Sequence, residues 1–277
     1  MRTSTRVAAW QCQPGPLDVD GNLGRLDEIC ARAAAQLVQL LVTPEMYISG
    51  YGLTPDQVLR LAEDAGGPTE AAVAQIALRH RIAIVYGHPE RAPGGGAYNA
   101  ATLVGPDGVT RGRHRKVHLF GDVDRRLFVP NADPPTAFDF DGSRVGILIC
   151  YDVEFPEAVR RLAVDGARAV LVPTANMTGF DEVQQILVRA RACENGCGVV
   201  YANYCGADDL FDYNGLSEIC GPGGQLLAQA GAEGEQLVIA QGEELARSET
   251  VGDRCEVGRD PGDGRGADLE APSAGHR

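Results

Sequence analysis

The stretch SRVGILICYDVEFPEAVRRLAV, residues 143–164, decides the fold class. Its first eight residues form a nearly continuous apolar run, which is typical of a strand buried on both faces. A helical pattern follows over residues 156–164, and we expect Glu154 and Glu157 in the first turn of that helix. Cys150 is therefore expected at the end of a buried strand, on a polar rim and near a helix N-terminus, where a thiolate is favoured.

Strand and helix patterns alternate on both sides of this stretch. Strands are predicted at residues 6–13, 36–43, 81–88, 98–104, 113–119, 167–176 and 198–205, with a hairpin at 221–229. Helices are predicted at residues 18–37, 54–63, 68–80 and 181–194. No internal repeat of fixed period is detected. The sequence therefore predicts an α/β chain.

The length is compatible with a single domain. A chain of 277 residues is long for an average domain, but α/β sandwiches and barrels reach this size undivided. We predict one domain over residues 1–245. From residue 246 onward there are seven acidic residues, five arginines and almost no aliphatic residues, so residues 246–277 are predicted to be a poorly ordered tail. The alternative is an arm that packs on a partner subunit, which the lack of apolar anchors disfavours.

The charge of the chain limits its classes of partner. It has 25 basic and 38 acidic residues, a formal net charge of −13 and a pI near 4.8. Like charges would repel it from a phosphate backbone and from anionic lipid, so neither nucleic acid nor membrane is an expected partner. We find no signal-peptide pattern and no apolar stretch of membrane-spanning length. A cytoplasmic enzyme is expected.

The eight cysteines are spread singly along the chain, which predicts reduced thiols and not a disulfide framework. Cys193 and Cys197 have helical spacing and could form half of a metal site. No second pair or histidine follows at the spacing of zinc ligands. We therefore interpret these two residues as small buried hydrophobic side chains and predict no metal.

Three residues from separate stretches could form a catalytic site. Glu45 in TPEMYISGY and Lys116 in HRKVHLFG are expected at strand ends, as is Cys150 in GILICYDVEFPE. Attack by sulfur needs a base to take the thiol proton, and none of the five histidines has the setting of a cysteine-protease partner. The economical solution is that Glu45 accepts the proton and Lys116 stabilises the anionic intermediate. Each residue alone also has a simpler interpretation, as a core thiol, a capping carboxylate or a surface charge.

The order and setting of these residues resemble the carbon-nitrogen hydrolases of the nitrilase superfamily. Glu45 and Lys116 are 71 residues apart and Lys116 and Cys150 are 34 apart, both within the range of that family. Four further stretches resemble family segments in the right order: VPTAN (172–176), RARACEN (189–195), ANYCG (202–206) and NGLSEICGPGG (214–224). The resemblance covers the chain except its tail.

The resemblance implies the fold and further site residues. The expected fold is a four-layer αββα sandwich, whose subunits pair through helices near the site into a homodimer or a larger homo-oligomer. Asp124 stands eight residues after Lys116, where the family commonly has a longer glutamate that positions the substrate. The backbone amide of Tyr151 would join Lys116 in the oxyanion hole. Four residues match positions at the substrate pocket: Tyr151, Glu154, Ala175 and Asn176. Of these, Glu154 matches an acid near the amino end of the substrate.

The residues after the cysteine indicate a branch of the family. Nitrilases usually continue with Trp and Glu and carbamoylases with Asn, Asp and arginines, whereas CYDVEFPE looks like the amidase branch. We predict an amidase that converts small aliphatic or amino-acid amides to a carboxylic acid and ammonia through a thioester on Cys150, without a cofactor. A nitrilase or an N-carbamoyl amide hydrolase is an alternative. A catalytically idle binding or scaffold protein and a redox sensor at Cys150 are alternatives from other classes.

Overall fold

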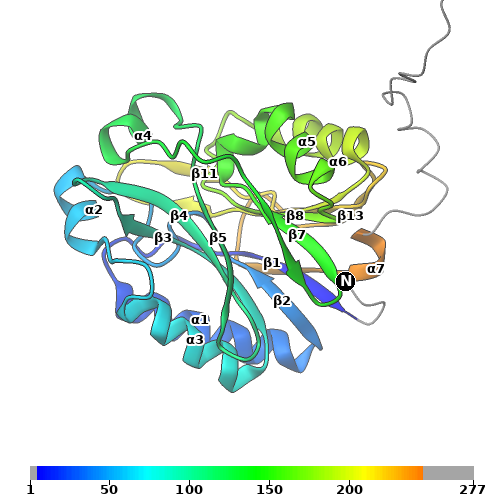
Figure 1. Ribbon diagram of the computed structural model, residues 1–277, viewed down its shortest axis with the longest axis horizontal. Helices are drawn as coiled ribbons and strands as arrows, with labels where there is room; N and C mark the ends of the chain where they lie inside the picture. Colours follow the sequence, from blue (N-terminus) through cyan, green and yellow to red (C-terminus); the bar gives the residue numbers. More distant parts are fainter. Residues whose placement is uncertain (1–4, 246–277) are drawn as a thin grey trace, which may run out of the picture.

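Two six-stranded β-sheets pack against each other in the computed structural model, which describes residues 5–245 (Figure 1). The first sheet has the order β14 (Gln236–Gln241), β1 (Arg6–Gln11), β2 (Val38–Val42), β3 (Ala83–Arg91), β4 (Ala97–Val104), β5 (Thr110–Arg115). The second has the order β13 (Leu226–Gln229), β12 (Glu218–Cys220), β9 (Gly198–Ala202), β8 (Ala169–Pro173), β7 (Ser143–Ile147), β6 (Ala137–Phe140). β10 (Cys205–Ala207) and β11 (Asp212–Asn214) form a separate two-stranded sheet.

The inner faces of the two large sheets share one apolar core. Val7 of β1 and Val85 of β3 belong to the same buried cluster as Ile147 of β7 and Leu171 of β8, and all four are fully buried. Burial of these aliphatic side chains is the main force that holds the sheets together.

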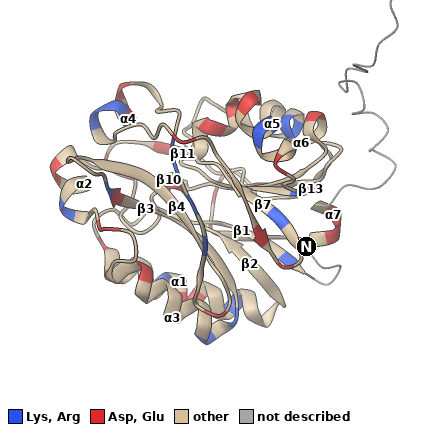
Figure 2. Ribbon diagram, in the orientation of Figure 1, with Lys and Arg blue, Asp and Glu red and all other residues tan. Residues whose placement is uncertain are grey.

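Helices cover both outer faces of the sandwich (Figure 1). α1 (Val19–Ala35) and α3 (Pro68–His80) pack on the first sheet, and α5 (Pro156–Val164) and α6 (Arg189–Asn195) pack on the second. α2 (Pro55–Leu61) and α4 (Gly121–Leu127) are short connecting helices, and α7 (Gly242–Leu245) follows β14. Charged residues lie mainly on the helices and connecting segments (Figure 2). The layers run helix, sheet, sheet, helix, so the predicted αββα sandwich is confirmed.

Parallel strands bring the candidate residues to one edge. β1, β2 and β3 are parallel neighbours, as are β7, β8 and β9. Parallel neighbours need crossover connections, which the helices provide, and their carboxyl ends lie at the same edge of a sheet. The segments that follow β7 and β8 therefore emerge at one edge of the second sheet. The backbone hydrogen bond from Glu45 to Thr174 brings the segment that follows β2 to the same place.

Several predicted boundaries were wrong. β7 ends at Ile147, and Cys150 begins a short 3₁₀ turn, η1 (Cys150–Glu154), because its φ of 45° is incompatible with a strand. Glu154 therefore belongs to this turn and not to the first turn of α5, which begins at Pro156. The helix predicted at residues 181–194 is divided into a π-helical segment, η2 (Val183–Val188), and α6. Such segments are frequent at functional sites.

The structure can be compared with the predictions about membrane spans, cysteines and metal sites. Within residues 5–245, no helix is long and apolar enough to cross a membrane, and no disulfide joins the cysteines. Cys197 is buried, but Cys193 is exposed, because the buried face of α6 is formed by other residues of its turns. The same part of the chain contains no group of three side chains suited to hold a metal ion. The predicted tail, residues 246–277, lies outside the described residues.

Candidate active site

Cys150 lies in an unusual backbone conformation beside a cavity. It begins the turn after β7 with a φ of 45°, in the left-handed region. Residues other than glycine adopt this region rarely, and such positions cluster at functional sites. Cys150 is partly exposed and lines a cavity of about 250 Å³. The thiol of Cys150 therefore faces a cavity that a small molecule could enter.

Glu45 reaches the same region from the first sheet. It follows β2, and its backbone N–H donates to the Thr174 carbonyl at 3.1 Å, which joins the ends of β2 and β8. Its side chain is fully buried. One carboxylate oxygen, Oε1, accepts hydrogen bonds from Asn99 Nδ2 and from Lys116 Nζ, both at 2.7 Å. The carboxylate is thus held in one orientation by two donors.

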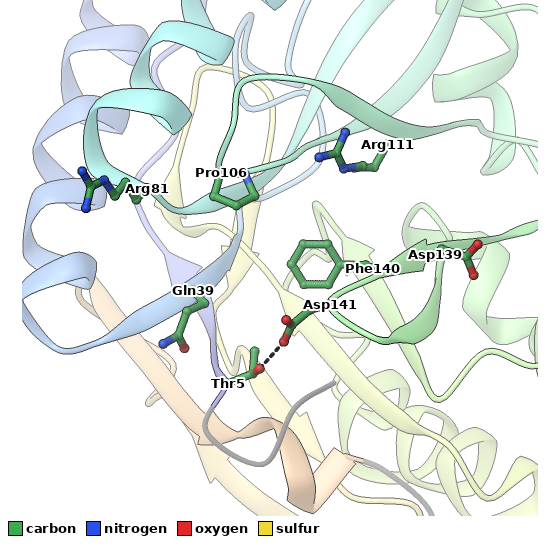
Figure 3. A pocket seen from close by; sticks show the side chains of 8 residues that line it. All are labelled: Thr5, Gln39, Arg81, Pro106, Arg111, Asp139, Phe140 and Asp141. Atoms are coloured by element: carbon green, nitrogen blue, oxygen red, sulfur yellow. Dashed lines mark hydrogen bonds between the residues drawn. The ribbon is translucent and has the colours of Figure 1, made fainter.

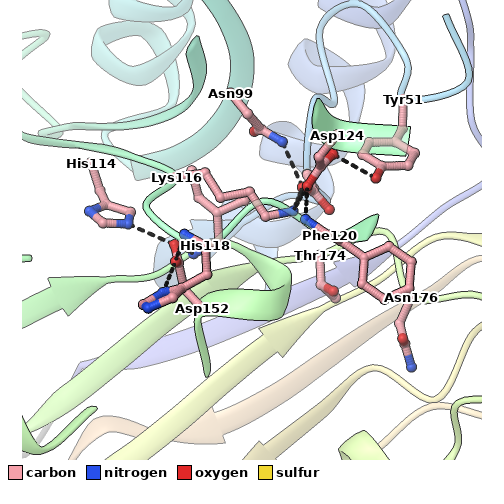
Figure 4. A network of polar contacts seen from close by, with 12 residues as sticks. Tyr51, Asn99, His114, Lys116, His118, Phe120, Asp124, Asp152, Thr174 and Asn176 are labelled. Atoms are coloured by element: carbon pink, nitrogen blue, oxygen red, sulfur yellow. Dashed lines mark hydrogen bonds and ion pairs between the residues drawn. The ribbon is translucent and has the colours of Figure 1, made fainter. Parts of the chain in front are cut away.

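Lys116 joins two buried carboxylates (Figure 4). It follows β5, and its Nζ lies 2.7 Å from Glu45 Oε1 and 2.7 Å from Asp124 Oδ2. All three side chains are completely buried. Burial alone would lower the pKa of Lys116, but the charges of Asp124 and Glu45 raise it well above its ordinary value. The ammonium ion therefore keeps its proton and its charge in the protein interior.

The second oxygen of Glu45 is available for chemistry. Oε2 is buried and has no hydrogen-bond partner among the described residues. Burial raises the pKa of the Glu45 carboxyl, and the charge of Asp124 raises it further, while Lys116 and Asn99 lower it. A carboxylate with a raised pKa is a better proton acceptor than one in water.

The thiol of Cys150 is not stabilised as a thiolate in the resting site. Burial of the sulfur raises its pKa, and the charge of Glu45 raises it further, whereas Lys116, the Thr174 side chain and the Ala175 backbone lower it. The expectation that a helix N-terminus favours the thiolate is wrong here, because burial dominates and the following turn has only five residues. The thiol needs a base when it reacts.

Four of the ten residues that line the cavity beside Cys150 are aromatic. Tyr151, Glu154, Ala175 and Asn176, four residues predicted at the pocket, all line it. The other aromatic side chains of the wall are Tyr51, Phe120 and Phe180. The Phe120 ring packs edge-on against both Tyr151 and Phe180, with ring centroids 5.4 Å and 5.7 Å apart. These contacts fix the width of the cavity.

Asp124 is placed differently from the prediction. It does not line the cavity, because both of its oxygens are used behind Lys116. Oδ1 accepts a hydrogen bond from the Tyr51 hydroxyl at 2.8 Å, and Oδ2 accepts from Lys116 and from the Phe120 backbone N–H. Its short side chain reaches Lys116 because α4 brings it close. Asp124 orients the lysine and does not face the cavity.

Two carboxylates give the cavity a negative side. Glu154 and Glu182 are the charged residues in its lining. Burial, together with the charge of Glu182, raises the pKa of Glu154 to about 6, and Lys116 and Arg191 act in the opposite direction. The charge on this wall therefore changes in the weakly acidic range.

The sequence analysis missed several residues of the site. Tyr51 closes the quoted stretch TPEMYISGY and Thr174 stands inside VPTAN, so their place next to chosen residues was an available signal. Asn99 lies within β4, and only the paired strands show that it meets Glu45. His114 and His118 were set aside as bases, yet both contact Asp152 beside the site.

A second cavity lies elsewhere in the fold (Figure 3). It has a volume of about 330 Å³ and is lined by Thr5, Arg81, Arg111 and Phe140, among others. None of the predicted site residues lines it. Five of the eight predicted site residues line the smaller cavity instead: Cys150, Tyr151, Glu154, Ala175 and Asn176. The other three, Glu45, Lys116 and Asp124, form the buried cluster and do not line it.

The chain is similar to known hydrolases over most of its length. It is 45% identical over 255 residues to the "Hydrolase in pqqF 5'region" of Pseudomonas protegens, which covers 90% of this chain and 88% of that one. It is 36% identical over 223 residues to the (R)-stereoselective amidase of a Pseudomonas species, covering 80% and 79%. A solved variant of the Nesterenkonia AN1 amidase, from the nitrilase superfamily, matches with a TM-score of 0.80 and 36% identity over 86% of this chain and 92% of that one. Another structure of that amidase has the acetamide moiety of fluoroacetamide added at its active-site cysteine.

The family model for carbon-nitrogen hydrolases matches residues 6–248, which include both six-stranded sheets and all the residues that line the cavity at Cys150 or form the buried cluster of Glu45, Lys116 and Asp124. The predicted resemblance is therefore confirmed: this chain belongs to the carbon-nitrogen hydrolase family, within the nitrilase superfamily.

Proposed function

We propose that this protein is an amidase that hydrolyses small amides to a carboxylic acid and ammonia through a thioester on Cys150. The observation that carries the proposal is the buried cluster of Glu45, Lys116 and Asp124 next to the cavity at Cys150. Its lysine is held by two carboxylates, and one oxygen of Glu45 is left without a partner among the described residues. The amidases among its relatives support the same activity.

The chemistry follows from the donors and acceptors of the cluster. Glu45 takes the proton of the Cys150 thiol as sulfur attacks the amide carbon, and the carbonyl oxygen becomes an oxyanion. The C–N bond then breaks, and Glu45 gives the proton to the leaving ammonia. A water molecule, deprotonated by Glu45, attacks the thioester. The C–S bond breaks, the acid leaves and the thiol regains its proton.

Lys116 has a free donor for the oxyanion. An ammonium group has three N–H donors, and Glu45 and Asp124 accept two of them. The third can bind the oxyanion, together with the backbone N–H of Tyr151. A fixed donor of this kind is worth about 10²–10³ in kcat.

The cavity limits the substrate by size and by charge. Its volume of about 250 Å³ suits small amides. Glu154 and Glu182 would repel an amide that bears a carboxylate and would tolerate one that is neutral or carries an amine. We therefore place aliphatic and amino-acid amides first. Relatives named as 2-oxoglutaramate amidase and omega-amidase are a reason to include an amide with a carboxylate in the test.

The proposal is tested by ammonia release from a panel of neutral, cationic and anionic amides of equal length. Cys150→Ala should release no ammonia, whereas Cys193→Ala, which removes an exposed cysteine outside the site, should behave as the wild type. Mass spectrometry should find an acyl group on the Cys150 peptide only. If the wild type and Cys150→Ala are equally inactive on every amide, the amidase proposal fails.

The same panel separates the alternatives. A nitrilase would consume a nitrile faster than the amide of the same carbon chain, and an N-carbamoyl amide hydrolase would prefer an N-carbamoyl amino acid. We disfavour the N-carbamoyl amide hydrolase, because an N-carbamoyl amino acid carries a carboxylate that Glu154 and Glu182 in the cavity wall would repel. We disfavour the nitrilase, because the stretch CYDVEFPE resembles the amidase branch.

We also propose that the protein acts in the cytoplasm and, from the family resemblance, that it forms a homodimer or a larger homo-oligomer. Light scattering coupled to gel filtration would give the mass of the particle. A monomer at micromolar concentration would contradict the proposed assembly.

A further inference from the structure

The buried carboxylate of Asp152 contacts two histidines, His114 and His118, of another chain segment. Its Oδ2 lies 2.9 Å from His114 Nε2, and its Oδ1 lies 2.8 Å from His118 Nδ1. Oδ1 also accepts the backbone N–H of His118 at 2.9 Å, and Oδ2 accepts the backbone N–H of Ile149 at 3.3 Å. Asp152 and His114 are buried, whereas the His118 side chain is 32% exposed.

The positions of these partners along the chain carry the inference. His114 and His118 stand two residues before and two residues after Lys116, and Asp152 stands two residues after Cys150. The contacts of one carboxylate therefore join the segment that carries the lysine to the turn that carries the thiol. Figure 4 shows His114 and His118 reaching Asp152 while the Lys116 side chain extends the other way, to Asp124.

We call Asp152, His114 and His118 the clamp, and its contacts keep the Asp152 carboxylate in its charged form. Burial alone would raise the pKa of Asp152, but the hydrogen bonds from His114 and His118 lower it well below its ordinary range. The His118 ring also stacks on Phe155, with centroids 3.8 Å apart. Phe155 meets the ring of Tyr151 edge-on at 5.0 Å, and Tyr151 lines the cavity.

We propose that Asp152 is a positioning residue, which uses His114 and His118 to fix the distance between the Lys116 ammonium and the Cys150 sulfur. Asp152 does not line the cavity, so it acts through the placement of other groups. The inference rests on the proposed roles of Lys116 and Cys150. A displacement of about 1 Å in a reacting group can cost about 10² in rate, so a loosened clamp lowers kcat more than it raises KM.

The decisive comparison is between His118→Ala and His118→Asn. Both variants lose the stack on Phe155, but only asparagine keeps an N–H near the position of Nδ1 that can donate to Asp152. We expect kcat to fall about tenfold or more in His118→Ala and to recover to within about threefold of the wild type in His118→Asn, with KM changed by less than about twofold in both. A purely structural role would lower both variants equally.

A second comparison uses Asp152→Asn, with Asp27→Asn as the matched control. Asp27 also binds a histidine, His80 at 2.7 Å, but it joins α1 to α3 on the outer face of the first sheet. Per active site counted by thiol titration, we expect Asp152→Asn to lose about 10–100-fold in kcat and Asp27→Asn to lose less than about twofold.

The outcomes separate this inference from the proposed function. Equal kcat values for His118→Ala and His118→Asn, or wild-type kcat in a folded Asp152→Asn, would overturn the clamp. If the wild type hydrolyses no amide, the proposed function fails. The clamp is then tested by the rate at which iodoacetamide alkylates Cys150, measured on its peptide by mass spectrometry. This rate should differ between the variants in the same order as expected for kcat, and equal rates in His118→Ala and His118→Asn would overturn the clamp. If Asp152→Asn does not fold, the His118 pair decides.

Discussion

Replacing Glu45 by glutamine should separate the chemistry of this site from its stability. Glutamine has the same shape and keeps an oxygen that can accept the hydrogen bonds of Asn99 and Lys116. It cannot take a proton. Loss of a positioned general base costs about 10²–10⁴ in kcat/KM, which corresponds to about 3–5 kcal/mol of transition-state stabilisation.

The stability of Glu45→Gln relative to the wild type is expected to depend on pH. Two carboxylates compete for one ammonium ion in the buried cluster, and glutamine leaves the neutral pair of Lys116 and Asp124. Because burial raises the pKa of Glu45, its contribution to stability is fully present below its unfolded pKa and is lost as the pH rises through the folded pKa. The variant should therefore gain stability relative to the wild type as the pH is raised from one value at the unfolded pKa of a glutamate, about 4.3, to a second value well above it.

The assay is ammonia release from the best amide of the panel, together with thermal unfolding at both pH values. Glu218→Gln is the matched control. Glu218, in β12, is also buried and is paired with a cation, the guanidinium group of Arg189. The control should keep kcat within about threefold of the wild type, as expected for a site away from the chemistry. A Glu45→Gln enzyme whose kcat/KM stays within tenfold of the wild type would refute the assignment of the base.

Three further predictions concern other residues of the site. Lys116→Met leaves Glu45 and Asp124 buried without a cation and should lower the free energy of unfolding by about 3–5 kcal/mol, as read from urea denaturation; an unchanged midpoint would contradict the buried cluster. Tyr51→Phe removes the donor to Asp124 Oδ1 and should cost about 1–3 kcal/mol by the same measurement. The KM of a cationic amide should fall as the pH rises through about 6, because Glu154 ionises there, and Glu154→Gln should abolish this dependence. A KM profile identical in both enzymes would place the amine elsewhere.

Local patterns determined the elements of the fold well. The helices predicted at residues 68–80 and 156–164 have the bounds of α3 and α5, because a proline begins each one and its apolar positions recur at helical spacing. The apolar run at residues 143–150 predicted a buried strand, but not its end at Ile147, since the run is apolar up to Cys150 and does not reveal the left-handed backbone there.

The residues of the candidate site were predicted in part, because only some of them stand in recognisable local motifs. Glu45, Lys116 and Cys150 stand in short stretches whose residue types and spacing carry a resemblance, so their identities could be named from the sequence. The structure alone placed Asp124 behind Lys116 and left one oxygen of Glu45 without a hydrogen-bond partner among residues 5–245. Those facts depend on which side chains share a buried space, and burial is a property of the packed sheets.

The sequence by itself determined the α/β alternation, the family and the residues that could react, because periodicity, breakers and local motifs are properties of neighbouring residues. Only the tertiary structure decided the direction in which the pKa of Cys150 moves, the acidic wall of the cavity and the contacts of Asp152 with His114 and His118. Distances and desolvation arise between residues far apart in the chain, and they exist only once both sheets have packed.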